Sequence, residues 1–370
     1  MTTADQDPVT LTAHCLCKAN IFTSRVSKSN LPLQAYACHC DSCRHVTGAL
    51  YSVDLRWPTP RAEVNVSKLK VFHHFASIDL LFCPTCSTPM FFADRNDKDR
   101  LLGVFSGVLT NEDVNLVEFA NHIFINDTKE GGASVWLRHN ASGSQIKRFK
   151  KTIAAPVPIC CKCKGVEFVL HRGDYTGIEE DELPFHIDPV THKLLAGFCG
   201  CDSCRLQAGV DLFNWTYSEM KYLSFGNSDR PFPTNSYDLK RLADARDPAL
   251  GTLTYYSSRE GVERYFCSNC SACVFYATTL RPEIIDVAIG LLETPVGARA
   301  ENLLSWSWGA RISHREDADG GWRGKLFDSI EKQAEEYRIQ RVYPKNHKRL
   351  VKDENGGKTP ESWYFGEKGI

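Results

Sequence analysis

The sequence predicts a mainly β protein made of two tandem domains, with one helix near the C-terminus. Two observations carry this prediction: a cysteine pattern that occurs twice, and many short segments rich in Val, Ile, Phe and Tyr between turn residues. A third observation is the helical spacing of apolar residues near the end of the chain. A length of 370 residues suits two domains of roughly 100–200 residues each.

The repeated pattern is a Cys-x-Cys pair, a Cys-x-Cys-x-x-Cys triplet and a Cys-x-x-Cys pair. The first copy consists of Cys15 and Cys17, then Cys38, Cys40 and Cys43, then Cys83 and Cys86. The second copy consists of Cys161 and Cys163, then Cys199, Cys201 and Cys204, then Cys267 and Cys270. Of the 16 cysteines, Cys160 and Cys273 lie outside the pattern. They are either spare ligands or inert buried thiols, and we expect inert thiols.

The copies also align between their cysteines. Residues 69–92 run without a gap against residues 253–276, whereas other segments of the second copy are longer, polar and rich in turn residues. Such insertions belong in surface loops. We therefore expect a first domain over residues 10–150, a second domain with longer inserts over 156–325, and a helix with a polar tail over 326–370.

Individual elements follow from local composition. Strands are expected at residues 70–75, 101–105, 116–119, 122–125, 253–256 and 284–289. A helix is expected near 326–340, because Phe327, Ile330, Ala334 and Tyr337 recur at helical spacing. Two prolines within residues 150–158 predict a linker between the domains.

Composition excludes several classes of protein. A net charge of −1 offers no field for phosphates, so we expect no nucleic-acid partner. No apolar run approaches the ~20 residues of a membrane span, and the N-terminal segment lacks the features of a signal peptide. We therefore expect a cytoplasmic protein, in a reducing compartment where thiols bind metal rather than pair.

Seven cysteines per copy are awkward for disulfides but suit two metal ions. The two outer pairs can close one tetrahedral zinc site in each copy, with Cys15, Cys17, Cys83 and Cys86 in the first and Cys161, Cys163, Cys267 and Cys270 in the second. A zinc ion contributes ~10–16 kcal/mol in small peptides, and a whole domain is stable by ~5–15 kcal/mol. We therefore expect these eight cysteines to be structural, and up to four Zn²⁺ ions per chain.

The triplets leave one position of a second zinc ion open, and an open position is where a substrate binds. Cys38, Cys40 and Cys43, and likewise Cys199, Cys201 and Cys204, are therefore the predicted catalytic ligands. The alternative is that a nearby His, Asp or water closes the site, which is then structural too, with His39 and His45 as local candidates in the first copy.

Three further side chains each have two possible roles. Arg44 and Arg205 directly follow the triplets, where they either bind a substrate carboxylate or neutralise the anionic zinc–thiolate cluster. His122 is either structural or a proton shuttle, and a structural role is the more common one.

The combination of Cys-x-Cys, Cys38-His-Cys-x-x-Cys-Arg and Cys83-x-x-Cys-x-Thr-Pro-x-Phe-Phe resembles the glutathione-dependent formaldehyde-activating enzyme family, which includes centromere protein V. The stretches 121–126 and 285–290 also resemble that family. The resemblance implies two Mss4-like coiled, mostly antiparallel β domains, with a structural zinc on the outer pairs and a catalytic zinc on the triplet.

The resemblance further implies a carbon–sulfur lyase that acts on a thiol adduct, such as the adduct of glutathione and formaldehyde. The small-molecule partner would then be this adduct, bound at the triplets. A rival interpretation is a non-catalytic zinc scaffold that mediates protein–protein interaction.

Overall fold

The computed structural model describes residues 8–137, 156–343, 349–352 and 358–361 of the chain. Its regular structure is mainly β, and the two largest sheets have seven strands each. The predicted fold class is therefore confirmed. None of the helices in the described part of the chain is long and apolar enough to span a bilayer.

The two large sheets have the same architecture. The first runs in the order β5 (Lys70–Phe75), β6 (Ile78–Phe82), β7 (Pro89–Asp94), β8 (Gly103–Phe105), β4 (Ser52–Arg56), β3 (Leu33–Cys38) and β9 (Val117–Ile123). The second runs in the order β15 (Leu253–Arg259), β16 (Val262–Cys267), β17 (Cys273–Thr278), β18 (Ile284–Ala288), β13 (Phe213–Glu219), β12 (Leu194–Cys199) and β19 (Leu304–Trp306). In both, the last two strands are parallel and the others antiparallel. We call residues 8–137 the first repeat and residues 156–321 the second repeat.

Smaller elements complete each repeat. The small sheets consist of β1 (Val9–His14) with β2 (Ile21–Val26), of β10 (Val157–Cys160), β11 (Glu167–Leu170) and β14 (Leu223–Phe225), and of β20 (Arg349–Lys352) with β21 (Lys358–Glu361). The described α-helices are α1 (Asp41–Thr47), α2 (Asp202–Ala208), α3 (Ser236–Asp244) and α4 (Trp322–Arg341).

The predicted elements agree with the structure apart from some boundaries. Residues 116–119 and 122–125 were expected to form two strands but contribute to one, β9, which keeps its pairing with β3 through a register shift opposite Ala35 and Tyr36. The C-terminal helix begins at Trp322, ahead of the predicted residue 326. Residues 150–155 of the predicted linker lie outside the described residues, and Pro158 lies in β10.

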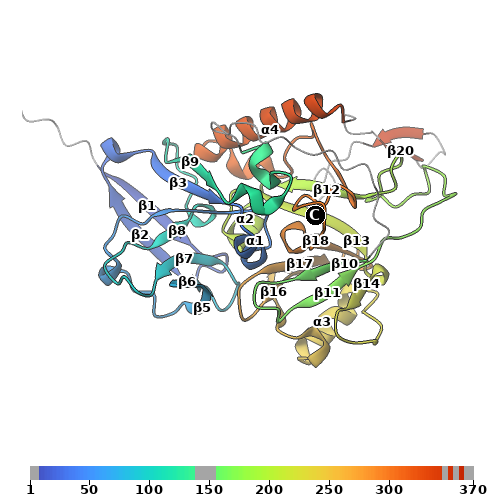
Figure 1. Cartoon of the computed structure of the whole chain (residues 1–370), viewed down its shortest axis with the longest axis horizontal. Helices are drawn as coiled ribbons and strands as arrows, with labels where there is room; N and C mark the ends of the chain where they lie inside the picture. The colour runs from blue at the N-terminus through green and yellow to red at the C-terminus, as the bar shows by residue number, and fades with distance from the viewer. Residues whose placement is uncertain (1–7, 138–155, 344–348, 353–357, 362–370) are drawn as a thin grey trace, which may run out of the picture.

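The repeats pack together through backbone segments that require glycine. Helix α1 packs on the 3-10 turn η8 (Ile289–Leu291) of the second repeat, and α2 packs on the matching turn η3 (Ser106–Val108) of the first. The N–H of Gly290 donates to the carbonyl of Gly48 at 3.0 Å, and the N–H of Gly107 donates to that of Gly209 at 3.1 Å. Figure 1 shows α1 and α2 in the middle of the molecule, where the blue first repeat meets the second. The interface therefore has approximate two-fold symmetry.

Helix α4 ties the two repeats together along one side of the molecule (Figure 1). The indole N–H of Trp322 donates to the carbonyl of Thr110 in the first repeat at 3.3 Å. The buried Arg323 donates to the carbonyl of Ser106 at 2.7 Å and to the carboxylate of Asp211 at 2.7 Å. One arginine thus holds η3 and the segment after α2, so α4 reinforces the same interface.

The substitution Gly290→Ala is expected to lower the free energy of unfolding by roughly 2 kcal/mol or more, as over-packed sites do. A Cβ atom there would lie 2.0 Å from the carbonyl oxygen of Ala49, so the repeats would have to move apart. Urea unfolding of the metal-loaded protein measures the loss. Gly324→Ala is the matched control, because the nearest atom is 3.2 Å away and alanine favours a helix by about 1 kcal/mol. Equal destabilisation by both substitutions would contradict the proposed role of Gly290.

Candidate metal centres

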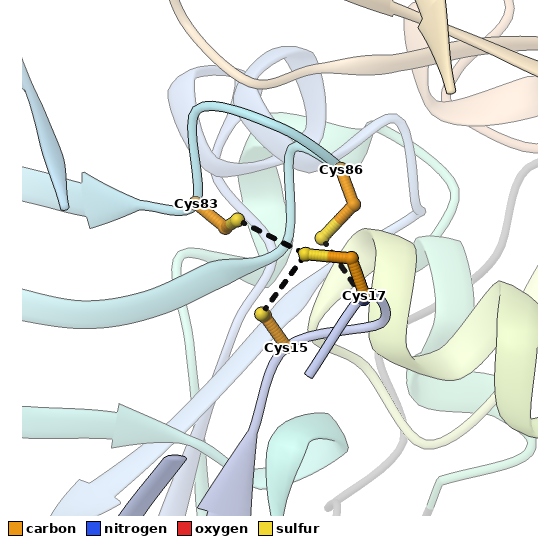
Figure 2. A group of neighbouring side chains, drawn as sticks. All are labelled: Cys15, Cys17, Cys83 and Cys86. Atoms are coloured by element: carbon orange, nitrogen blue, oxygen red, sulfur yellow. Dashed lines mark hydrogen bonds between the residues drawn. The ribbon is translucent and has the colours of Figure 1, made fainter. Parts of the chain in front are cut away.

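Four cysteines from two distant segments meet in the first repeat (Figure 2). Cys15 and Cys17 follow β1, whereas Cys83 and Cys86 lie on the turn between β6 and β7. The sulfur of Cys17 is 3.5 Å from that of Cys15 and 3.6 Å from that of Cys83, and its backbone N–H donates to the Cys86 sulfur at 3.4 Å. All except Cys17 are buried. The two outer pairs of the pattern therefore form one cluster.

The second repeat contains the same cluster. Cys161 and Cys163 follow β10, Cys267 is the last residue of β16, and Cys270 lies on the turn between β16 and β17. The sulfur of Cys163 is 3.6 Å from that of Cys161 and 3.4 Å from that of Cys267. All four ligand atoms lie within 4.8 Å of one another, as they do in the first repeat.

The sulfur separations fit a tetrahedrally bound ion. Zinc–sulfur bonds of about 2.3 Å place two sulfurs about 3.8 Å apart, close to the separations found in both clusters. Without a cation, the thiols cannot all ionise. The pKa of Cys15 is lowered because Cys83 and Cys86 hydrogen-bond to its thiolate, whereas burial raises the pKa of Cys17 to about 11. Both clusters could therefore hold a metal ion, with a divalent cation balancing the thiolates.

The two triplets lie at the N-termini of matching helices. Cys40 is the N-cap residue of α1, and its sulfur accepts the backbone N–H of Cys43 at 3.3 Å. Cys201 caps α2 in the same way, accepting from Cys204 at 3.3 Å. The helix dipole favours thiolates at this end. The Cys-x-Cys-x-x-Cys spacing thus encodes a helix start that gathers three sulfurs.

The sulfurs of the triplets are close enough to share one ion. The Cys38 and Cys40 sulfurs are 3.4 Å apart, and those of Cys199 and Cys201 are 3.5 Å apart. Hydrogen bonding between the thiols lowers the pKa of Cys40 to about 2 and raises that of Cys38 to about 12. Each triplet could therefore hold a metal ion through three thiolates.

No fourth protein ligand joins either triplet within the described residues. There, neither set has a His, Asp or Glu ligand atom within 4.8 Å of all three sulfurs. His39 is directed to His122 instead, with its Nε2 2.9 Å from Nδ1 of that residue. His45 lies with Cys160 and Glu293. These contacts do not support closure of the first triplet by either histidine.

A histidine lies beside the first triplet, and a buried carboxylate lies on the strand that pairs with β3. The Nε2 atom of His74, on β5, is 3.8 Å from the sulfur of Cys43. Burial lowers the pKa of His74 to about 4, so its imidazole is neutral at pH 7. Asp54, on β4, occupies the position of Trp215 on β13, because both strands pair in the same register with the strand that carries the first triplet cysteine. Burial raises the pKa of Asp54 to about 6.

The second triplet has a fixed cation in place of these titratable groups. Nη1 of Arg264 donates to the Cys204 sulfur at 3.4 Å, and the indole N–H of Trp215 donates to it at 3.4 Å. Burial opposes the charge on Arg264, but the Cys204 and Cys201 thiolates outweigh burial and raise its pKa. In the gapless alignment, Arg264 corresponds to Leu80 and His74 to Ser258. The groups next to the two triplets therefore differ at these four positions, although the cysteine pattern is the same.

A second difference lies between the first two cysteines of each triplet. The first repeat has His39 there, and the second has Gly200. A Cβ atom on Gly200 would lie 2.5 Å from the ring of Phe327 on α4. Glycine is therefore needed where α4 packs on the second triplet loop, whereas the first repeat buries His39 at this position beside His122.

Arg44 and Arg205 lie in the interface between the repeats. Each is buried and paired with the aspartate three residues earlier, Asp41 or Asp202. Nη1 of Arg44 donates to the carbonyl of Gly290 at 3.5 Å, and Nη1 of Arg205 donates to the carbonyl of Leu109 at 3.1 Å. Their contacts are thus with the opposite repeat. A role in binding a substrate carboxylate stays a prediction.

Comparison with known proteins supports the resemblance seen in the cysteine pattern. Residues 10–127 match the family model described as "Glutathione-dependent formaldehyde-activating enzyme". That model does not extend to the second repeat, although the strand order there is the same. No curated protein matches the chain significantly. Over residues 10–127 the chain is therefore similar to the glutathione-dependent formaldehyde-activating enzyme family.

Proposed function

We propose that the protein is a zinc-dependent carbon–sulfur lyase acting on the adduct of a thiol, of the glutathione type, with formaldehyde or another small carbonyl compound. The observation that carries this proposal is the first triplet, which has three thiolate ligands and no fourth protein ligand within the described residues. It lies in the segment that matches the family model. The expected setting is a reducing compartment such as the cytoplasm.

The proposal includes up to four zinc ions, one structural and one catalytic in type in each repeat. Cys15, Cys17, Cys83 and Cys86 would hold the structural ion of the first repeat, and Cys38, Cys40 and Cys43 the catalytic one. Zinc with one open position supplies Lewis acidity and affinity for thiolate sulfur. The corresponding clusters of the second repeat would hold the other two.

The reaction joins a thiol and a carbonyl compound, or separates them. In the forward direction a sulfur–carbon bond forms, the C=O double bond becomes C–OH, and the thiol proton ends on the oxygen. We propose His74 as the carrier of that proton, because its Nε2 lies 3.8 Å from the Cys43 sulfur. It would accept the proton from the thiol and return it to the adduct oxygen.

We propose that the first repeat carries the reaction. Arg264 and Trp215 both donate to the Cys204 sulfur, so the second triplet already has two fixed donors in place of a base. A guanidinium group does not release a proton near neutral pH. The scaffold interpretation is therefore favoured for the second repeat, and the lyase interpretation for the first.

The structural and catalytic clusters are expected to respond differently to substitution. Cys83→Ser should lower the apparent melting temperature by roughly 10 °C or more, because a lost structural ligand costs several kcal/mol. Cys40→Ser should abolish activity with a smaller change in melting temperature. Calorimetry of the zinc-loaded variants, beside an assay of adduct formation, measures both. Equal losses of stability would contradict the division of roles.

His74→Asn is expected to reduce kcat/KM for adduct formation about 100-fold, the contribution of a positioned acid–base group. His73→Asn is the matched control, because His73 is the neighbouring residue and its Nδ1 contacts Asp79 at 2.7 Å on the exposed side of the strand. NMR exchange spectroscopy with glutathione and formaldehyde measures the catalysed rate. If both variants lose activity alike, or neither does, His74 is not the proton carrier.

Glutathione should bind at the first triplet of the cobalt-substituted protein. A thiolate that enters an open three-cysteine site changes the thiolate-to-cobalt and visible bands in a saturable way. We expect this change in the wild type and in Cys201→Ser, and its loss in Cys40→Ser. An unchanged wild-type spectrum, with all sites loaded, would contradict an open site.

A further inference from the structure

A cavity of about 430 Å³ lies between the two repeats, and Cys161 of the second four-cysteine cluster is among its lining residues. In the first repeat it is lined by the N-terminal part of α1 and by residues 127 and 129. In the second repeat it is lined by the end of β10 with the loop that follows, and by the segment after η8. Three of its lining residues carry metal-binding atoms of different kinds: the imidazole of His45, the thiol of Cys160 and the carboxylate of Glu293. These three ligand atoms lie within 4.8 Å of one another.

The backbone holds these residues together across the interface. Cys160 is the last residue of β10, and Glu293 follows η8 with its N–H donating to the carbonyl of Pro158 at 2.9 Å. The N–H of Lys162 donates to the carbonyl of His45 at 2.8 Å. The positions of the three side chains are therefore fixed by strand pairing and by the docking of the Cys161 loop on α1.

The distances suit a tetrahedral ion of the zinc class. Zn–S and Zn–N bonds of about 2.3 and 2.0 Å place the two donors about 3.5 Å apart, and the Cys160 sulfur is 3.8 Å from Nδ1 of His45. The Glu293 oxygen is 2.9 Å from the same sulfur and is on an exposed side chain that can shift outward. A thiolate and a carboxylate balance the charge of a divalent cation.

The symmetry of the molecule supplies an internal comparison. The N–H of Thr110 donates to the carbonyl of Thr12 at 2.9 Å. This bond is equivalent to the one from the N–H of Glu293 to the carbonyl of Pro158 on the other side of the interface. The residues that correspond to Cys160, His45 and Glu293 are His14, Leu206 and Thr110. Packing of the repeats therefore does not require a thiol, an imidazole and a carboxylate at these places, since the opposite side packs without this set.

We infer that His45, Cys160 and Glu293 form a fifth metal site, specific for a divalent cation of the zinc class and shared by the two repeats. Water or an anion from the cavity completes the coordination. The site clamps α1 of the first repeat to β10 of the second. It is independent of the lyase reaction proposed for the first triplet.

Cobalt binding to protein that already carries four equivalents of zinc tests this inference. The four thiolate-rich clusters fill first, so a fifth equivalent of Co²⁺ should bind with visible bands and a charge-transfer band of single-thiolate intensity. Cys160→Ser should remove the charge-transfer band. Glu293→Gln, on the surface, should weaken Co²⁺ binding by more than about ten-fold, because even the loss of a residue that only supports a ligand costs 10–100-fold.

Cys273→Ala is the matched control, because Cys273 is the other cysteine outside the repeated pattern and is not a member of this three-residue set. The Cys273→Ala variant should bind the fifth equivalent of Co²⁺ with the same affinity as the wild type. Zinc content of four equivalents in every variant verifies that the cysteine clusters are intact. Absence of a fifth equivalent in the wild type, or its unchanged affinity in both Cys160→Ser and Glu293→Gln, would overturn the inference.

Discussion

The close contact of glycine backbones between the repeats is the constraint on which the rest of the structure depends. Gly48 and Gly209 end α1 and α2 in the left-handed conformation, and their carbonyls accept hydrogen bonds from Gly290 and Gly107. The opposite ends of the same two helices carry the cysteine triplets. A larger residue at any of these glycines would shift a helix and, with it, the sulfurs at its start. The packing of the interface therefore also determines the positions of the metal-binding sulfurs.

On this shared scaffold the two repeats differ in their electrostatics. The first places a neutral imidazole, His74, beside its triplet, and the second places a permanent cation, Arg264. A titratable group suits proton transfer, whereas a guanidinium group stabilises an anionic cluster without exchanging protons. The sheet topology is the same in both, so the difference lies in a few side chains that point at the sulfurs.

The sequence was sufficient for the fold class and for the grouping of the cysteines, because strand composition is local and ligand spacing is strongly constrained by geometry. It did not reveal α1 and α2, since seven residues are too few to show a helical period. It also missed His74 and Arg264, which reach the sulfurs only after strands distant in sequence have paired. Comparing the repeats at Leu80 and Arg264 would have shown where they diverge.

The approximate two-fold axis between the repeats makes the molecule equivalent to a dimer whose subunits are fused. In a dimer of identical chains, every substitution changes both copies of a site at once. Fusion of the two halves removes that restriction. A charged residue can then replace a neutral one in one repeat while the site of the other repeat is unchanged. Fusion also makes the association of the halves independent of protein concentration, because the second contact becomes intramolecular. A buried arginine beside one thiolate cluster is therefore a change that this chain can carry and that a symmetric pair would have to carry twice.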